Sequence, residues 1–207
     1  MFLLMGLDLI VQKMLTDEMI EHLYSTPVYS TPIKDYQVLN YHIDKVIDKV
    51  DFNQKEEWGT TNYISTDFMG HPQIIKDLGL HKVSQEIEKH LREYCNVLRY
   101  NIVKYRLESW FAKFEKGNYS QIHNHGKADI SGVYYYKTNG DDGDFFFESP
   151  NPFLGTTKCF WGAGRRWEYK PREGLILLFP GWLMHGVHRN MSDEDRMSIS
   201  FNISLTS

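Results

Sequence analysis

Two different hydrophobic periods divide the chain. Through residues 1–97, apolar side chains tend to recur every three or four positions, which is typical of helices with one buried face. Thr16 and the acidic residues after it predict a helix start, and residues 38–50 carry apolar side chains at helical spacing. Residues 82–97 have the most regular pattern and predict the clearest helix. Between these two segments, residues 51–80 are rich in Gly, Asn, Thr and Pro, so we expect an irregular covering segment with short turns.

From about Arg99 onward the period changes to two, as expected for β-strands. Seven short runs are rich in β-branched or aromatic residues and are bounded by Gly, Asn, Asp or Pro. These runs lie at residues 99–115, 121–125, 130–137, 144–149, 165–170, 174–180 and 197–205. The turn residues from Asn139 to Gly143 predict a hairpin connection. The pattern predicts an all-β barrel or sandwich with a helical layer, and the lack of a Pro- or Ser-rich linker favours one domain.

Composition narrows the classes of partner. Hydrophobic residues make up 42% of the 207 residues, which suffices for a folded core. The net charge of −4 argues against a surface for nucleic acid or for an anionic membrane, so small-molecule or protein substrates are favoured. No run reaches the length of a membrane span, and Asp8 interrupts the apolar start, so neither a membrane helix nor a signal peptide is predicted. Cys95 and Cys159 lack the spacing of a metal or redox motif, and we expect a cytoplasmic protein without a disulfide framework.

Three histidines are the strongest candidates for chemistry. His123 and His125 are two residues apart on a predicted strand, so both side chains should project from the same face. Neutral imidazole is the commonest protein metal ligand. His185 follows a buried strand and a Pro-Gly turn, and it could complete a facial set of three that leaves positions open for a substrate and dioxygen. His188 has the opposite parity to His185, so at most one of these two is expected in the set. The alternative is that His123 and His125 are ordinary surface or core histidines.

Arg196 stands at the start of the last predicted strand, residues 197–205, in which apolar and polar residues alternate and every second side chain should be buried. A guanidinium directed into a barrel needs a partner, and a carboxylate matches its planar fork best. Ser198 shares the face of Arg196 and could donate a second hydrogen bond to that carboxylate. The alternative is an exposed arginine that forms a salt bridge with Glu194 or Asp195 at the strand mouth.

The pattern of motifs in the second half of the chain resembles that of the iron(II)- and 2-oxoglutarate-dependent oxygenases, and within them a bacterial and phage-type family distantly similar to prolyl hydroxylases. Order and spacing both agree, and the resemblance is much closer in the C-terminal half than in the helical half. The residues that carry it are Trp110, Gly117, Tyr119, His123, His125, Ser131 to Tyr135, Gly174, Phe179, Pro180, Trp182, His185, Val187, Arg196, Ser198, Phe201 and Asn202.

The resemblance implies a mainly β fold, a double-stranded β-helix of the jelly-roll or cupin-like type, with N-terminal helices packed against it. Residues 98–207 would form this core and residues 1–97 a helical supporting region of the same single oxygenase domain. It also implies Fe(II) as the metal, with His123, His125 and His185 as its ligands.

The resemblance further implies 2-oxoglutarate as co-substrate, with Arg196 and Ser198 binding its C5 carboxylate. Tyr134 is expected to add a hydrogen bond to that carboxylate, with Tyr135 and Tyr119 as alternatives. The reaction would be hydroxylation of a C–H bond by dioxygen. No side chain beyond the metal centre is assigned as a general acid or base.

One position departs from the wider superfamily. An aspartate or glutamate usually stands where this chain has His125, and three neutral ligands leave the metal centre one unit more positive. Zinc or another divalent ion is an alternative, since sets of histidines bind several first-row metals. Asp129 could restore a carboxylate only if the strand turned back, because four extended residues span roughly 13 Å. A cupin-type metal enzyme is the first alternative to the oxygenase, although Arg196 has no role in it, and a metal-free binding barrel is the second.

The substrate is far less defined by the sequence. Trp161, Trp182 and the run 145–147 are candidates to border the mouth of the barrel, and residues 51–80 to form part of a lid. A peptidyl or a small-molecule C–H bond is expected, the peptidyl option only by analogy with prolyl hydroxylases. The oligomeric state is open, with a homodimer among the alternatives.

Overall fold

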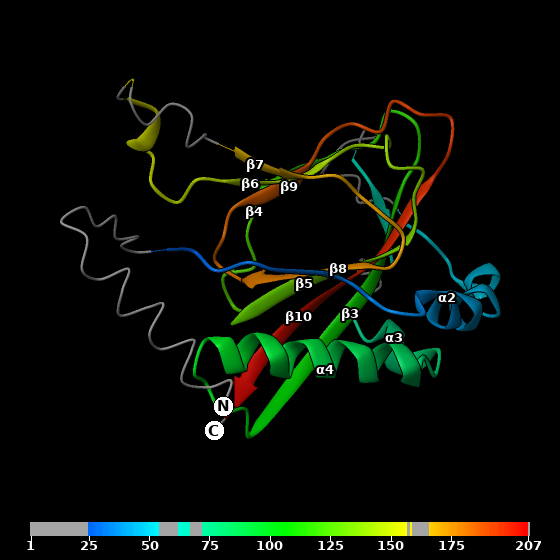
Figure 1. Cartoon of the computed structure of the whole chain (residues 1–207). Helices are drawn as coiled ribbons and strands as arrows, with labels where there is room; N and C mark the ends of the chain where they lie inside the picture. The colour runs from blue at the N-terminus through cyan, green and yellow to red at the C-terminus, as the bar shows by residue number, and fades with distance from the viewer. Residues whose placement is uncertain (1–24, 54–61, 67–71, 157, 159–165, 207) are drawn as a thin grey trace, which may run out of the picture.

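The chain folds as two antiparallel β-sheets with helices on one outer side (Figure 1). A computed structural model describes residues 25–53, 62–66, 72–156, 158 and 166–206. The expected mainly β fold, a double-stranded β-helix with helices packed against it, is confirmed. The predicted helix start at Thr16, and Cys159 and Trp161, lie outside the described residues.

The larger sheet has six strands in the order β1-β8-β5-β10-β3-β2. Its strands are β1 (Tyr29–Pro32), β2 (Ile64–Ser65), β3 (Lys104–Phe114), β5 (Ile130–Lys137), β8 (Leu175–Pro180) and β10 (Arg196–Thr206). The two longest strands, β3 and β10, pair along their whole length from Arg196↔Phe114 to Thr206↔Lys104. This pairing places Arg196 and Ser198, at the start of β10, beside the end of β3.

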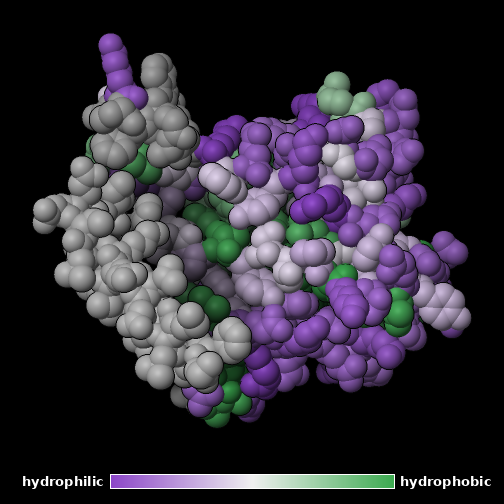
Figure 2. Space-filling view, in the orientation of Figure 1, coloured by the Kyte–Doolittle hydropathy of each residue, from purple (hydrophilic) through white to green (hydrophobic). Residues whose placement is uncertain are grey.

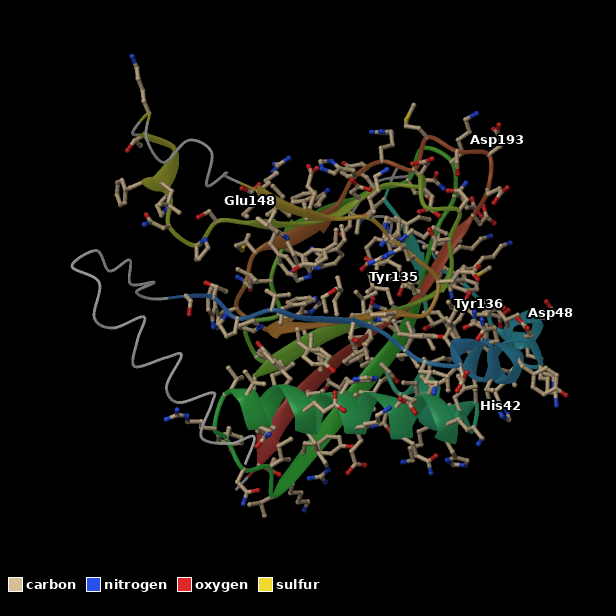
Figure 3. All side chains as sticks on the ribbon, viewed as in Figure 1. His42, Asp48, Tyr135, Tyr136, Glu148 and Asp193 are labelled. Carbon is tan, nitrogen blue, oxygen red and sulfur yellow. The ribbon has the colours of Figure 1, made fainter. Side chains whose placement is uncertain are left out.

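The smaller sheet has four strands in the order β4-β9-β6-β7. Its strands are β4 (Ser120–His123), β6 (Phe145–Glu148), β7 (Arg166–Tyr169) and β9 (His185–Val187). It lies opposite the larger sheet, and an aromatic core that includes Tyr135, Phe147 and Phe179 packs between the two. Tyr135 is labelled between the sheets in Figure 3. Hydrophobic residues also show in a recess near the middle of the face in Figure 2.

Helices cover the outer face of the larger sheet. They are α2 (Tyr36–Asp44), α3 (Ile74–Asp77) and α4 (His81–Val97), with the short 3-10 helix η1 (Ile47–Lys49) after α2. A second 3-10 helix, η4 (Leu154–Thr156), lies instead in the connection between β6 and β7 of the smaller sheet (Figure 1). In α4 the apolar positions recur at helical spacing, and Val83, Ile87 and Leu91 are almost completely buried against the sheet. The helix predicted over residues 82–97 is thus confirmed. The one predicted over residues 38–50 is present as α2 followed by η1.

The N-terminal region is not purely helical. It supplies β1, which pairs with β8, and β2, which pairs with β3. The pattern missed β1 because it is only four residues long and ends at Pro32, and proline is tolerated there because β1 is an edge strand. In the described parts of residues 51–80, β2 and α3 are the regular elements.

The segment from Asn139 to Gly143 does not form a hairpin. It carries the chain from β5 in the larger sheet to β6 in the smaller one. The carboxylate of Asp142 is fully buried and accepts hydrogen bonds from the Thr138 hydroxyl and the Asn139 backbone N–H, at 2.9 and 3.0 Å. The prediction was wrong because these bonds stabilise a corner between sheets instead of a two-strand turn.

Candidate metal centre

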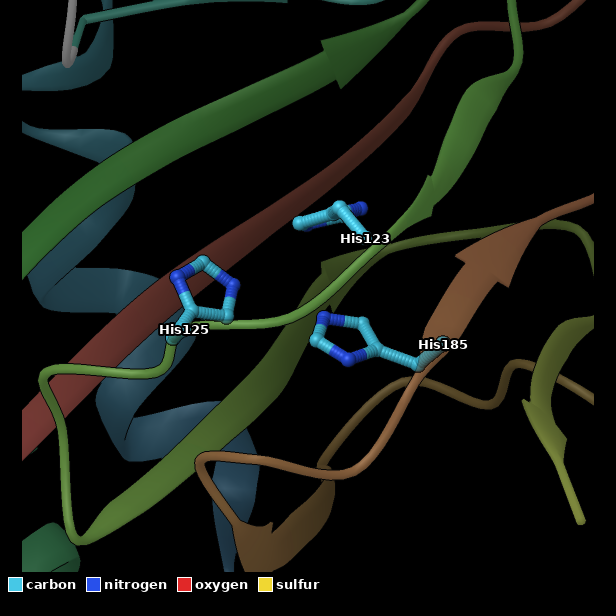
Figure 4. Close-up of side chains that lie close together, drawn as sticks. All are labelled: His123, His125 and His185. Carbon is cyan, nitrogen blue, oxygen red and sulfur yellow. The ribbon is translucent and has the colours of Figure 1, made fainter. Parts of the chain in front are cut away.

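Three histidine side chains converge at one end of the barrel (Figure 4). Each of His123, His125 and His185 offers a ring nitrogen, and these nitrogens all lie within 4.8 Å of one another. The ring centroids are 4.4 to 5.2 Å apart in the three pairs. Nitrogens this close can share a single ion. Among the described residues, these three histidines form the candidate metal-binding group.

The smaller sheet positions two of these histidines directly. His123 ends β4 and His185 begins β9, and the two are register partners in the antiparallel pair. The strand does not extend to His125 as the two-residue spacing had suggested. His125 lies in the following turn, where its backbone N–H donates to the Gly181 carbonyl at 2.8 Å and its carbonyl accepts from Ala128 at 2.7 Å. This turn, rather than strand parity, brings the His125 side chain to the other two.

Backbone carbonyls orient two of the imidazoles. The Nδ1 atom of His123 lies 2.7 Å from the Gln121 carbonyl, and the Nδ1 atom of His185 lies 2.8 Å from the Leu183 carbonyl. A carbonyl can only accept, so in each ring Nδ1 carries the hydrogen and Nε2 keeps its lone pair. This is the arrangement that metal-binding histidines ordinarily adopt.

Burial keeps the cluster uncharged near neutral pH. It lowers the pKa of His123, lowers the pKa of His125 to about 4, and lowers the pKa of His185 well below the ordinary value. The neighbouring His123 acts in the same direction on the other two rings. Neutral imidazoles are the form that binds a metal, so the cluster is ready to do so without losing protons.

His188 and Asp129 lie elsewhere. His188 faces outward, and its Nε2 is 3.0 Å from a carboxylate oxygen of Glu168 on β7. Asp129 uses its carboxylate to accept the Leu205 backbone N–H at 2.7 Å. Asp129 therefore stabilises the β5–β10 edge and is not part of the histidine cluster.

A partly open cavity lies between the two sheets, and Arg196 and Ser198 line it together with all three histidines. Arg196 is 1% exposed, and its Nη1 donates to the Gly143 carbonyl at 2.6 Å. The guanidinium also lies 4.9 and 5.0 Å from the ring centroids of Tyr135 and Phe114. Among the described residues no carboxylate pairs with it, and its Nε has no hydrogen-bond partner.

The alternative of an exposed Arg196 at the strand mouth is wrong. Asp195 instead pairs with Lys113, at 3.0 Å. Alternation in β10 directs Arg196 and Ser198 into the cavity, while Ile199 packs toward the helices. The buried guanidinium is thus a cation that faces the cavity without an anion among the described residues.

The structure does not bring Tyr134 to this cavity. Tyr134 faces the helices, and its hydroxyl donates to Asn40 on α2 at 2.6 Å. Tyr135 is the residue that faces Arg196, because neighbouring residues on a strand point to opposite faces. Its hydroxyl is fully buried with no hydrogen-bond partner, and burial raises the pKa of Tyr135 to about 12. The structure therefore places Tyr135, one of the expected alternatives, beside Arg196 instead of Tyr134, a choice that the motif alone could not make.

The aromatic residues expected at the mouth differ in placement. Trp182 is 53% exposed in the turn between β8 and β9, next to the strand that begins with His185. Phe145 and Phe147 are buried beside the Phe179 ring, so they form the barrel wall. The run 145–147 is thus part of the core.

The sequence and the fold were compared with those of known proteins. Residues 108–202 match the model of a family described as "Putative 2OG-Fe(II) oxygenase". This range contains the three histidines, Tyr135, Arg196 and Ser198. No match was found among curated proteins.

Solved structures share the fold at low sequence identity. A prolyl-4-hydroxylase from Pseudomonas putida superposes with a TM-score of 0.60 at 14% identity, over 89% of this chain and 96% of that one. HygX from Streptomyces hygroscopicus, with nickel and 2-oxoglutarate bound, gives 0.61 at 15% identity, over 87% and 84%. The viral collagen prolyl hydroxylase from Paramecium bursaria Chlorella virus-1 gives 0.51 at 19% identity, over 86% and 97%.

Proposed function

We propose that the chain is a 2OG-Fe(II) oxygenase, which the match of residues 108–202 to that family supports, and that it hydroxylates a substrate C–H bond at a centre built from His123, His125 and His185. The donor set fits such a metal, because three neutral imidazoles converge and two of them have Nε2 free. Three facial ligands leave positions for the co-substrate and dioxygen. When bound, Fe(II) and 2-oxoglutarate supply the oxidising chemistry, in which dioxygen is reduced and 2-oxoglutarate is converted to succinate and carbon dioxide.

The protein's own residues would hold and orient these groups. His123, His125 and His185 would hold the ion where they line the cavity. Phe145 stacks on the His185 ring at 5.4 Å and Phe179 meets it edge to face at 4.8 Å, which fixes its orientation and excludes water from that side. No side chain beyond the metal centre is proposed as a general base.

The proposed role of 2-oxoglutarate rests on one observation, which is that the buried Arg196 has no carboxylate partner among the described residues. A buried charge of this kind is costly unless it is paired. Arg196, with Ser198 beside it and the unpartnered Tyr135 hydroxyl opposite, would bind the C5 carboxylate of 2-oxoglutarate. This set of three donors, two lining the cavity and the third beside Arg196, has no use in a cupin-type metal site.

We treat residues 1–207 as one oxygenase domain, since β1 and β2 from the N-terminal region complete the larger sheet. None of the helices in the described ranges has the length and apolar character needed to cross a membrane. We place the protein in the cytoplasm, and the support is the buried, free thiol of Cys95 together with the low cysteine content. Nucleic acid is not proposed as a partner because the net charge is −4.

The substrate is proposed as either peptidyl or a small molecule. Proteins of similar fold include both a prolyl-4-hydroxylase and HygX, whose structure was also solved with hygromycin B bound. The fold therefore does not choose between the two classes.

The test is turnover of 2-oxoglutarate. Purified protein reconstituted with Fe(II) should release succinate slowly without added substrate, and His185→Ala should abolish this release. Metal analysis of protein purified without chelator is the companion measurement. A reconstituted protein that binds Fe(II) but never releases succinate would favour a binding barrel instead.

A further inference from the structure

His125 is the ligand candidate whose ring lacks a backbone carbonyl to orient it. His123 and His185 each have a backbone carbonyl oxygen at Nδ1, whereas the atom beside Nδ1 of His125 is the side-chain amide nitrogen Nδ2 of Asn202, 3.3 Å away. An amide offers both a donor and an acceptor. The orientation of this one side chain therefore decides which nitrogen of His125 carries hydrogen.

Asn202 is itself held by Ser131. The two residues are register partners between β10 and β5, and the Ser131 hydroxyl donates to the amide oxygen of Asn202 at 2.8 Å. A hydroxyl can donate to the amide oxygen or accept from the amide nitrogen. Turning the amide by half a rotation therefore keeps both hydrogen bonds, and an amide's oxygen and nitrogen are assigned from such a network.

Only one of the two orientations leaves His125 able to bind a metal on the side that faces its partners. With the amide nitrogen toward the ring, Nδ1 accepts and Nε2 must carry the hydrogen. With the amide oxygen toward the ring, Nδ1 donates and Nε2 keeps its lone pair, as in His123 and His185. Since Asn202 occupies the Nδ1 side, Nε2 is the atom left for the ion.

We propose that Asn202 is a positioning residue that accepts a hydrogen bond from Nδ1 of His125 and so presents Nε2 to the metal, with Ser131 fixing the amide. The inference rests on the proposed function, and it explains how a histidine can stand where oxygenases usually have a carboxylate. A carboxylate needs no partner to choose its ligand atom, but a histidine does. The ligand His125 and the acceptor Asn202 thus work as a pair.

The first test needs no metal. Nitrogen-15 spectra of histidine-labelled, metal-free protein at neutral pH should show His125 with hydrogen on Nδ1 and an unprotonated Nε2. In Asn202→Leu the two tautomers should mix, because leucine has a similar shape but no acceptor. Hydrogen on Nε2 of His125 in the wild-type protein would overturn the proposal whether or not the protein is an oxygenase.

The second test is anaerobic titration with Fe(II). Asn202→Leu should weaken binding by about 10- to 100-fold, the usual effect of removing such a partner. Asn202→Asp should stay close to the wild type, since a carboxylate also accepts from Nδ1. Ser204→Leu, on the same face of β10 two residues further on, is the matched control and should bind normally.

The outcomes separate the two proposals. A wild-type protein that binds no metal contradicts the proposed function, while the spectra still decide the tautomer. If the wild type binds Fe(II) and Asn202→Leu binds it as tightly as Ser204→Leu does, Asn202 has no positioning role. If Asn202→Leu does not fold, the Asn202→Asp variant and the wild-type spectra still decide.

Discussion

Replacing Arg196 by leucine should weaken 2-oxoglutarate binding strongly while leaving the stability of the free protein nearly unchanged. The guanidinium is buried and has no carboxylate partner among the described residues, and it makes a hydrogen bond to the Gly143 carbonyl. Leaving that carbonyl unpaired costs about 1–3 kcal/mol. Removing a buried charge that has no counter-ion stabilises the folded protein by a similar amount, on the order of several kcal/mol.

These two terms nearly cancel, so Arg196→Leu should unfold at a temperature close to the wild type's or slightly higher. No such cancellation applies to the binding of 2-oxoglutarate. Truncating one member of a buried charge pair costs about 2–5 kcal/mol, which corresponds to roughly 30- to 5,000-fold weaker binding. The affinity for Fe(II) should not change, since Arg196 lies beside Tyr135 and Phe114 and outside the histidine cluster.

The assay is anaerobic calorimetric titration of 2-oxoglutarate into the Fe(II)-loaded protein, with thermal unfolding of the metal-free protein alongside. Lys113→Leu is the matched control, because Lys113 pairs with Glu115 and Asp195 on a strand beside Arg196 and does not line the cavity. It should bind 2-oxoglutarate normally. An Arg196→Leu protein whose 2-oxoglutarate affinity stays within about threefold of the wild type would refute the reasoning.

Three further outcomes are expected. Tyr135→Phe should weaken 2-oxoglutarate binding by about 2- to 12-fold, the effect of one lost hydrogen bond. Tyr134→Phe should instead lose about 1 kcal/mol of stability, because its hydrogen bond to Asn40 is removed, and should bind 2-oxoglutarate normally. Calorimetry measures the binding and urea unfolding the stability, and equal losses of binding in the two variants would contradict this prediction. Burial lowers the pKa of His125 from 6.5 in the unfolded chain to about 4, so as the pH falls below 6.5 the unfolded chain takes up the proton first. The free energy of unfolding of the metal-free protein should therefore fall between pH 6.5 and 4, by up to about 3 kcal/mol from this group. A urea midpoint that does not change over this pH range would contradict the prediction. Gly132→Ala should destabilise the fold by about 1–3 kcal/mol or more in urea unfolding, because the added Cβ would lie 2.3 Å from the Phe201 ring and 2.6 Å from the Leu177 carbonyl; an unchanged midpoint would show that the sheet adjusts freely.

The periodicity of the chain predicted most of the strands because each is rich in buried aromatic or β-branched side chains. Strand β1 has no such pattern, since only alternate residues of its four are even partly shielded, and its place is fixed by pairing with β8. The same limit applies to Asn139 through Gly143, where the buried Asp142 converts an apparent hairpin into a crossing between sheets. These outcomes depend on tertiary contacts that no local pattern contains.

The candidate site could be predicted as a set of residue types but not in its details. The spacing of His123 and His125 suggested one strand face, yet the strand ends at His123 and a turn places His125. The choice between Tyr134 and Tyr135 required the register of β5 against β10, in which Tyr135 lies opposite Ser198. Asn202 carried no chemical signal of its own until the His125 ring was found beside it.

The central claim is tested most directly by anaerobic titration of the wild-type protein with Fe(II) and then with 2-oxoglutarate. Chelation of the bound metal by 2-oxoglutarate should produce a weak visible charge-transfer band, and the band should be absent in His123→Ala and His185→Ala. A folded wild-type protein that binds neither Fe(II) nor 2-oxoglutarate and never develops the band would contradict the account.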